Sequence, residues 1–134
     1  MRRFILAIMA IALSSSLYAQ DFEELFKDGT LRIDYTFMGN AHDQYVALRD
    51  MSYTDNWYGR RINLDNVPLM GNGDLTLRDI NSGKVIYKTS FSSLFQEWIT
   101  TPEALEVSKS FEFTLLVPMP LNPATATLVL RDNT

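Results

Sequence analysis

The residues of this chain that could do chemistry are few, and their types exclude most kinds of active site. The 134 residues include one histidine, His42, and no cysteine. A thiolate zinc site, a cysteine nucleophile and a metal site built on two or three histidines are therefore excluded. A Ser-His-Asp triad would have to use His42, which stands in a polar turn segment where a solvated histidine is the simpler interpretation. The sequence contains no His-Glu-x-x-His, Gly-x-Ser-x-Gly or phosphate-loop motif.

The carboxylates do not select a site either. Sixteen acidic residues offer many pairs for acid–base catalysis, and the sequence singles out none of them. Asp65-Asn66 and Asn72-Gly73-Asp74 could supply oxygen ligands to calcium, but neither has the spacing of a calcium-binding loop, and turn formation accounts for both. We predict no catalytic residue, no metal ligand and no cofactor in this chain.

The most suggestive residues stand at the start of an aperiodic stretch, residues 54–73. They form a candidate recognition surface of Tyr53, Trp57, Tyr58, Arg60 and Arg61. Aromatic and arginine side chains dominate the binding energy of many interfaces, and aromatic rings on loops can also stack on sugars. The alternative is structural, with Trp57 closing one end of the core and the arginines pairing with nearby acids. The sequence does not decide whether Trp57 and Tyr58 are core or surface residues.

Alternation of apolar and polar residues predicts the elements that must position this segment. Leu31, Ile33, Tyr35 and Phe37 share one face of a strand at 30–39. Similar patterns predict strands at 44–53, 74–80, 85–91, 110–117 and 125–131, with turns at 39–43 and 81–84 and with prolines at 118, 120 and 123 ending the fifth strand. Cap signals predict one or two short helices in 93–108, and 21–28 is either a helical turn or an extended arm. The expected fold class is all-β, an antiparallel β-sandwich of about six to seven strands with one or two short helices between the late strands.

The first nineteen residues are predicted to be a secretory signal peptide. Arg2 and Arg3 precede an apolar stretch at 4–13, and small and polar residues lead to a cleavage site after Ala19. Ten apolar residues span about 15 Å as a helix, half of a bilayer core, so no transmembrane anchor is expected. The predicted location is periplasmic, cell-surface or secreted.

Residues 20–134 are expected to form a single domain. Removal of the two leader arginines changes the net charge from −4 to −6. An acidic domain without a basic stripe is not expected to bind nucleic acid.

Several segments together resemble a known family. They are Leu31-Arg32-Ile33-Asp34-Tyr35, Gly39-Asn40, Trp57-Tyr58-Gly59, Gly71-Asn72-Gly73, Leu77-Arg78-Asp79, Ser-Gly-Lys-Val-Ile-Tyr at 82–87, Ser-Phe-Ser-Ser-Leu-Phe-Gln-Glu-Trp at 90–98, Thr-Thr-Pro-Glu-Ala at 100–104, Ser-Phe-Glu at 110–112 and Val-Pro-Met-Pro at 117–120. This combination is similar to the N-terminal domain of the IgA-specific zinc metallo-endopeptidases of gut Gram-negative anaerobes, metallopeptidase family sixty-four. The likeness covers nearly all of the chain after the leader.

The resemblance implies a noncatalytic accessory module of a secreted bacterial zinc peptidase. Such a module would pack against or position a catalytic domain, in cis or in trans, and contact with immunoglobulin or another protein substrate is a further expectation. The family's catalytic domain carries a His-Glu-x-x-His helix that this sequence lacks, so no catalytic or zinc residue is carried over.

Two questions stay open on the sequence. The last predicted strand runs almost to Thr134, so either the domain finishes on an edge strand or the chain is a fragment of a longer peptidase. The alternative function is a stand-alone secreted carbohydrate- or surface-binding sandwich that uses Tyr53, Trp57 and Tyr58.

Overall fold

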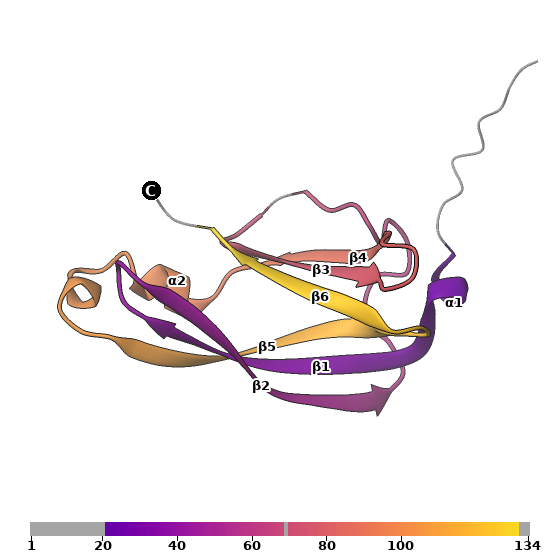
Figure 1. Cartoon of the computed structure of the whole chain (residues 1–134), viewed down its shortest axis with the longest axis horizontal. Coiled ribbons are helices and arrows are strands. Elements are labelled where there is room, and N and C mark those ends of the chain that lie inside the picture. Colours follow the sequence, from indigo (N-terminus) through magenta and orange to yellow (C-terminus); the bar gives the residue numbers. More distant parts are fainter. Residues whose placement is uncertain (1–20, 69, 132–134) are drawn as a thin grey trace, which may run out of the picture.

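Two antiparallel three-stranded sheets make up the fold in a computed structural model that describes residues 21–68 and 70–131. The strands are β1 (Phe26–Gly39), β2 (Gln44–Asp55), β3 (Gly73–Asp79), β4 (Val85–Phe91), β5 (Lys109–Pro120) and β6 (Ala124–Leu130). One sheet has the order β2-β1-β5 and the other the order β4-β3-β6, and the two lie one above the other (Figure 1). The prediction of an all-β antiparallel fold is confirmed. The predicted signal peptide lies outside the described residues.

Short helices stand where cap signals predicted them. Helix α2 (Leu94–Trp98) begins after Ser93, whose hydroxyl oxygen accepts the backbone N–H of Gln96 at 3.2 Å. The 3-10 helix η1 (Pro102–Leu105) follows, with proline at its first position. A single helical turn, α1 (Phe22–Leu25), precedes β1.

β1 and β2 form a long hairpin that runs through both predicted strands. Their register extends from Gly39 opposite Gln44 to Gly29 opposite Asp55. Gly39 has a φ of 132°, and a Cβ at this position would stand 1.9 Å from the carbonyl oxygen of Asp43. Only glycine therefore fits the turn that sets this register. A bulge near the middle of the hairpin adds Arg49 to β2 without a partner on β1.

The ends of two strands differ from the prediction. β1 begins at Phe26, four residues earlier than expected. β5 continues through Pro118 to Pro120, although the prolines were expected to end it after Val117. Pro118 pairs with Thr30 and Pro120 with Phe26, across an irregularity in the ladder. β5 lies at the edge of its sheet, where a proline without an N–H can be accommodated.

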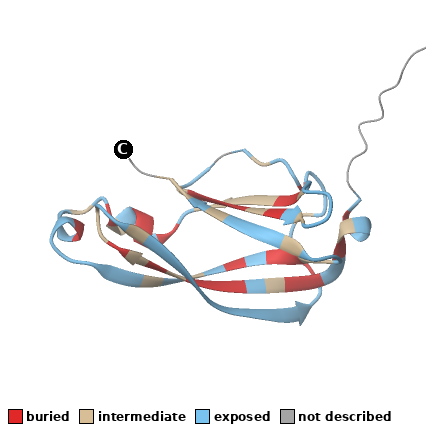
Figure 2. Ribbon diagram, viewed as in Figure 1, coloured by how far each residue is buried: buried red, intermediate tan, exposed pale blue. Residues whose placement is uncertain are grey.

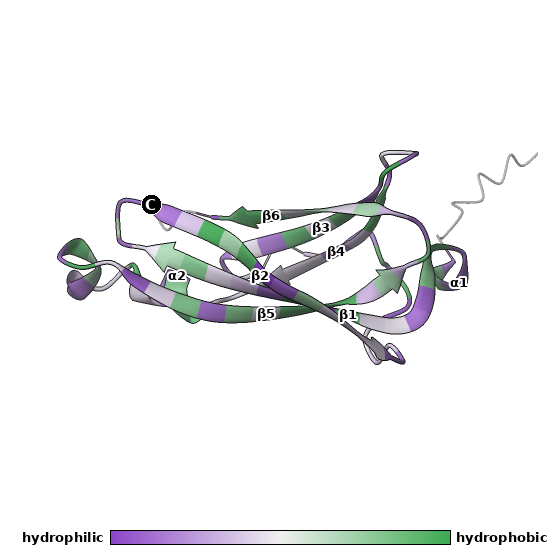
Figure 3. Ribbon diagram, turned by 60° about the horizontal axis from the view of Figure 1, so that its bottom comes forward, coloured by the Kyte–Doolittle hydropathy of each residue, from purple (hydrophilic) through white to green (hydrophobic). Residues whose placement is uncertain are grey.

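The hydrophobic core lies between the two sheets. Figure 2 colours the buried residues red, and Figure 3 shows apolar and polar residues along the strands. The buried strand residues of the core are Phe26, Ile33, Tyr35 and Phe37 of β1, Leu115 and Val117 of β5, Leu75 and Leu77 of β3, and Ile86 and Tyr87 of β4. Phe37 is fully buried, and its ring centroid lies 5.2 Å from that of Phe113 and 6.2 Å from those of Phe91 and Phe95. Strands from both sheets and helix α2 therefore meet around one side chain.

Candidate functional site

Trp57 is the second residue of the loop between β2 and β3, and it is a core residue. Its side chain is only 7% exposed, and its ring meets that of Tyr87 edge-on at 6.1 Å between centroids. The indole N–H donates to the backbone carbonyl of Arg60 at 3.0 Å, so its polar atom is satisfied. The structure thus supports the structural alternative for Trp57, and this ring is not available to stack on a ligand.

Arg60 is held by the same part of the core. Its guanidinium group lies 4.7 Å above the ring of Tyr87 and donates to the backbone carbonyls of Leu64 and Lys88. These contacts join the irregular loop to strand β4. Arg60 therefore acts within the fold, although it pairs with carbonyl oxygens and not with the acids that the sequence suggested.

Arg61 makes the ion pair with a local acid that the structural alternative predicted. Its guanidinium group donates to Asp28 at 2.7 Å and to the carbonyl of Trp57 at 2.9 Å, and it lies 4.6 Å above the ring of Phe22. Asp28 also accepts the backbone N–H of Trp57 at 2.8 Å. That backbone hydrogen bond, and then the bond from Arg61, lower the pKa of Asp28. Arg61 and Asp28 together fasten the loop to the start of β1.

The two tyrosines of the candidate surface lie in different surroundings. The Tyr53 ring lies on Gly29 of the neighbouring strand, so closely that a Cβ on Gly29 would come within 2.4 Å of it. Tyr58 is 88% exposed. The five predicted residues thus do not form one free recognition surface, since Trp57 and Arg60 are committed to the fold. Recognition through Tyr58 stays a prediction.

The other polar residues that the sequence singled out stabilise turns and strand ends. His42 is exposed in the β1–β2 turn, where its backbone N–H donates to Asn40. Asp74 is buried, and its carboxylate accepts the Ser90 hydroxyl at 2.6 Å and pairs with Arg131. Among residues 21–68 and 70–131, no three His, Cys, Asp or Glu side chains are grouped so that they could hold a metal ion.

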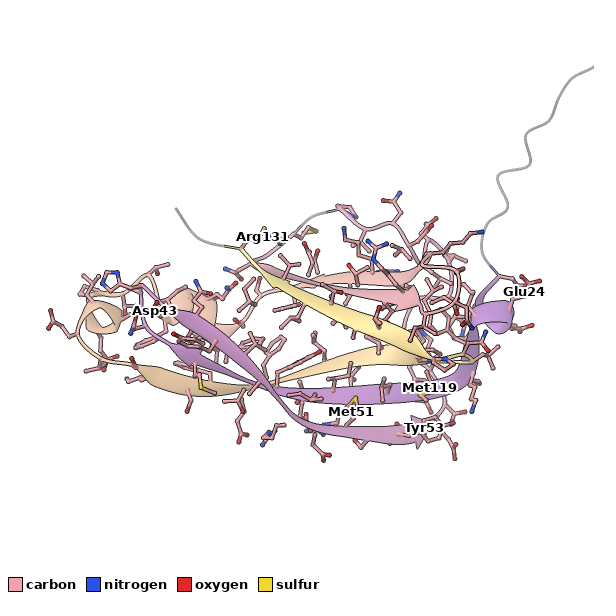
Figure 4. All side chains as sticks on the ribbon, viewed as in Figure 1. Glu24, Asp43, Met51, Tyr53, Met119 and Arg131 are labelled. Atoms are coloured by element: carbon pink, nitrogen blue, oxygen red, sulfur yellow. The ribbon has the colours of Figure 1, made fainter. Side chains whose placement is uncertain are left out.

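An apolar groove that the sequence did not reveal opens along one side of the sandwich. It has a volume of about 460 Å³ and is lined mainly by apolar side chains, which include Leu31, Ile33, Met51, Leu77, Met119 and Leu121. These residues come from both sheets and from the β5–β6 turn, so only the tertiary structure brings them together. Figure 4 labels Met51, Tyr53 and Met119 on this side of the molecule.

Strand β2 borders this groove and is almost entirely exposed. The alternation at 44–53 predicted a strand with Val46 and Leu48 on one face, and in the structure every residue from Tyr45 to Asp55 is exposed. The residues of β2 that pair with the buried face of β1 are Val46, Leu48, Met51 and Tyr53. They are 41–56% exposed, because the sheet β4-β3-β6 does not cover them.

Four carboxylates, three of them on the surface and one, Asp34, buried, have lowered pKa values. They are Asp28, Asp34, Asp79 and Glu103, and each accepts hydrogen bonds that favour its charged form. For Asp34 the largest cause is the hydroxyl of Thr114, its pairing partner on the adjacent strand β5, which donates at 2.5 Å. These groups bind the proton more weakly in the folded chain than in the unfolded one.

We expect the chain to lose stability in acid. A carboxyl group with a lowered folded pKa stabilises the fold above its unfolded pKa, 3.8 for Asp and 4.5 for Glu, and this stabilisation is lost as the pH falls through the folded value. The melting temperature should therefore fall steadily below about pH 4. Circular dichroism melts from pH 6 to pH 2 measure it, with Asp34→Asn as the variant expected to show a shallower fall. A melting temperature that is constant down to pH 2 would contradict the expectation.

No helix in the described part of the chain is long and apolar enough to cross a membrane.

The comparisons with known proteins agree with the resemblance. No curated protein matches the chain. A family model described as Peptidase M64 N-terminus matches residues 21–134, which include all six strands of the two sheets. This chain belongs to the Peptidase M64 N-terminus family.

Proposed function

We propose that the chain is the noncatalytic N-terminal module of an exported zinc metallopeptidase, and that it packs against and positions the catalytic domain. The observation that carries this proposal is the family match over residues 21–134, whose description is the N-terminus of a peptidase. The match spans all six strands of the two sheets. The catalytic domain is provided either in the same chain or as a separate protein.

The apolar groove supports the packing part of the proposal. Its lining combines both sheets and the exposed methionine and leucine side chains of β2 and the β5–β6 turn. Exposed apolar surface of this kind is typical of contacts with another protein. Contact with immunoglobulin, or with another protein substrate of the peptidase, is the finer part of the proposal.

A binding measurement with matched variants tests this function. The partner is a catalytic domain of the family that carries the His-Glu-x-x-His helix, with immunoglobulin A as a second analyte, and calorimetry measures the affinity. We expect Leu121→Asp, in the groove, to weaken binding of the catalytic domain at least about tenfold, a loss of about 1.4 kcal/mol. Tyr58→Ala, outside the groove, is the control and should leave the affinity unchanged. Absence of binding to either analyte would overturn the proposal, and a loss confined to Tyr58→Ala would transfer recognition to the loop.

Export is the second part of the proposed function, and its support is the leader pattern of residues 1–19. Mass spectrometry of the chain expressed in a Gram-negative host should find a mature protein that begins at Gln20 in the periplasm or medium. An uncleaved chain in the cytoplasm would contradict export and would leave the family assignment untouched.

A further inference from the structure

Strand β2 is an edge strand that nothing covers in the part of the chain that the structure describes. It pairs with β1 on one side only, and both of its faces are exposed over nearly twelve residues (Figure 2). An edge of this length with unpaired N–H and C=O groups is a template for a further strand. It contains neither proline nor lysine, and its charged residues are Arg49, Asp50 and Asp55.

The sequence of β2 is complementary to itself in the antiparallel direction. When two copies are aligned so that the paired residue numbers add to 99, each apolar residue of the inner face meets another from the same face. Val46 then lies opposite Tyr53 of the other copy, and Leu48 lies opposite Met51. All four of these side chains are on the same face as the buried residues of β1, so the register keeps apolar side chains together.

The polar residues agree with the same register. On the outer face, Tyr45 meets Thr54 and Ala47 meets Ser52. At the centre, Arg49 meets Asp50 of the other copy, so opposite charges face each other twice across the two-fold axis. A shift of this register by one residue would place inner-face residues opposite outer-face residues.

The bulge lies at the centre of this pattern. Arg49 is its extra residue, and its guanidinium group pairs across the outer face with Glu112 of β5 at 2.8 Å. Both groups of that ion pair are substantially exposed, so the pair contributes little to stability and Arg49 can reach a second acid. Because a bulge bends and twists its strand, the regular pairing is expected on either side of it, at 44–48 and at 51–55.

We infer that β2 pairs with β2 of a second copy of this chain, in antiparallel orientation about a two-fold axis between Arg49 and Asp50. The β2-β1-β5 sheets of the two copies then form one six-stranded sheet with the order β5-β1-β2-β2-β1-β5. The pairing uses the same patch on both copies, as a two-fold dimer requires. This inference rests on the edge, the register and the charges of β2, and it does not depend on the proposed function.

Charge exchange at the axis is the first test. Sedimentation equilibrium of the purified chain should show a monomer–dimer equilibrium. Arg49→Asp and Asp50→Arg should each weaken the dimer at least about tenfold, because like charges then face each other twice. The double variant Arg49→Asp/Asp50→Arg restores opposite charges and should restore dimerisation. Glu112→Gln is the control, since it removes the partner of Arg49 within the chain and should leave the dimer intact.

Cysteine cross-linking tests the register itself, because the chain has no cysteine of its own. In the double variant Ala47→Cys/Ser52→Cys the two thiols lie five residues apart on one strand, about 16 Å, beyond the reach of a disulfide within one copy. Mild oxidation should therefore give a covalent dimer in high yield. Ala47→Cys/Thr54→Cys is the control. In the proposed register position 47 lies opposite position 52 of the other copy, two residues away from the thiol at 54, so this variant should cross-link poorly.

Three results would overturn the inference. The first is a chain that stays monomeric at millimolar concentration. The second is a dimer that both single charge variants leave unchanged, since the contact would then lie elsewhere. The third is a monomer whose β2 variants, Arg49→Asp among them, instead lose binding to the catalytic domain, since a strand of that domain would then occupy the edge.

Discussion

Trp57→Ala is expected to lower the free energy of unfolding by about 3–5 kcal/mol. The side chain is 7% exposed and closes the end of the core against Tyr87, and its indole N–H holds the carbonyl of Arg60. Truncation would leave a cavity as well as an unpaired carbonyl oxygen, and the loop that carries Arg60 and Arg61 would lose its anchor. Urea unfolding measures the effect, with far-ultraviolet circular dichroism as the signal because tryptophan fluorescence would change with the substitution itself.

Tyr58→Ala is the matched control for that substitution. Tyr58 is the next residue along the chain and is 88% exposed, so its truncation should change the free energy of unfolding by no more than about 0.5 kcal/mol. The contrast separates the two roles that the sequence left open. If Trp57→Ala melted at the same temperature as the unmodified chain, the ring would be a surface residue and ligand stacking would again be a hypothesis for it.

Phe37→Ala is the second substitution with a large expected effect, again about 3–5 kcal/mol. Phe37 is fully buried at the point where β1, β4, β5 and helix α2 meet, and Phe91, Phe95 and Phe113 surround its ring. Loss of the ring removes several aromatic contacts at once, and each contact stabilises the fold beyond the burial of apolar area. The same denaturant unfolding experiment measures the loss.

Leu116→Ala provides the control for Phe37. Leu116 is on β5 and is 54% exposed on the outer face of the same sheet, opposite Arg32. The substitution Leu116→Ala should lower the free energy of unfolding by less than about 0.5 kcal/mol. Equal losses for Phe37→Ala and Leu116→Ala would mean that the inner face of the sheet is not the core.

Short-range features of the fold were predictable because single residues encode them. The alternation in β1 and β5, the glycine turn after Asn81, the cap at Ser93 and the proline of η1 each act over a few residues, and each is found in the structure. The continuation of β5 through Pro118 was not predictable. A proline ends a central strand but not an edge strand, and the sequence does not state which of the two β5 is.

The candidate site shows the same division. Residue types alone put Trp57, Arg60 and Arg61 into a recognition set, because aromatic and arginine side chains serve both cores and interfaces. The structure separates these roles by supplying the partners: Tyr87 under Arg60, Asp28 beside Arg61 and the core beneath Trp57. None of these partners is within four residues of the side chain it binds.

By itself, the sequence determined the fold class, the main strands and their hairpins, and the exclusion of cysteine and multi-histidine chemistry. These follow from composition and from periods of two residues, which are local properties. Only the tertiary structure decided which apolar side chains are covered. β1 and β2 both alternate, but the inner face of β1 is buried in the core with residues of the second sheet, and the same face of β2 is exposed. Burial depends on what packs against a face, and no strand encodes that alone.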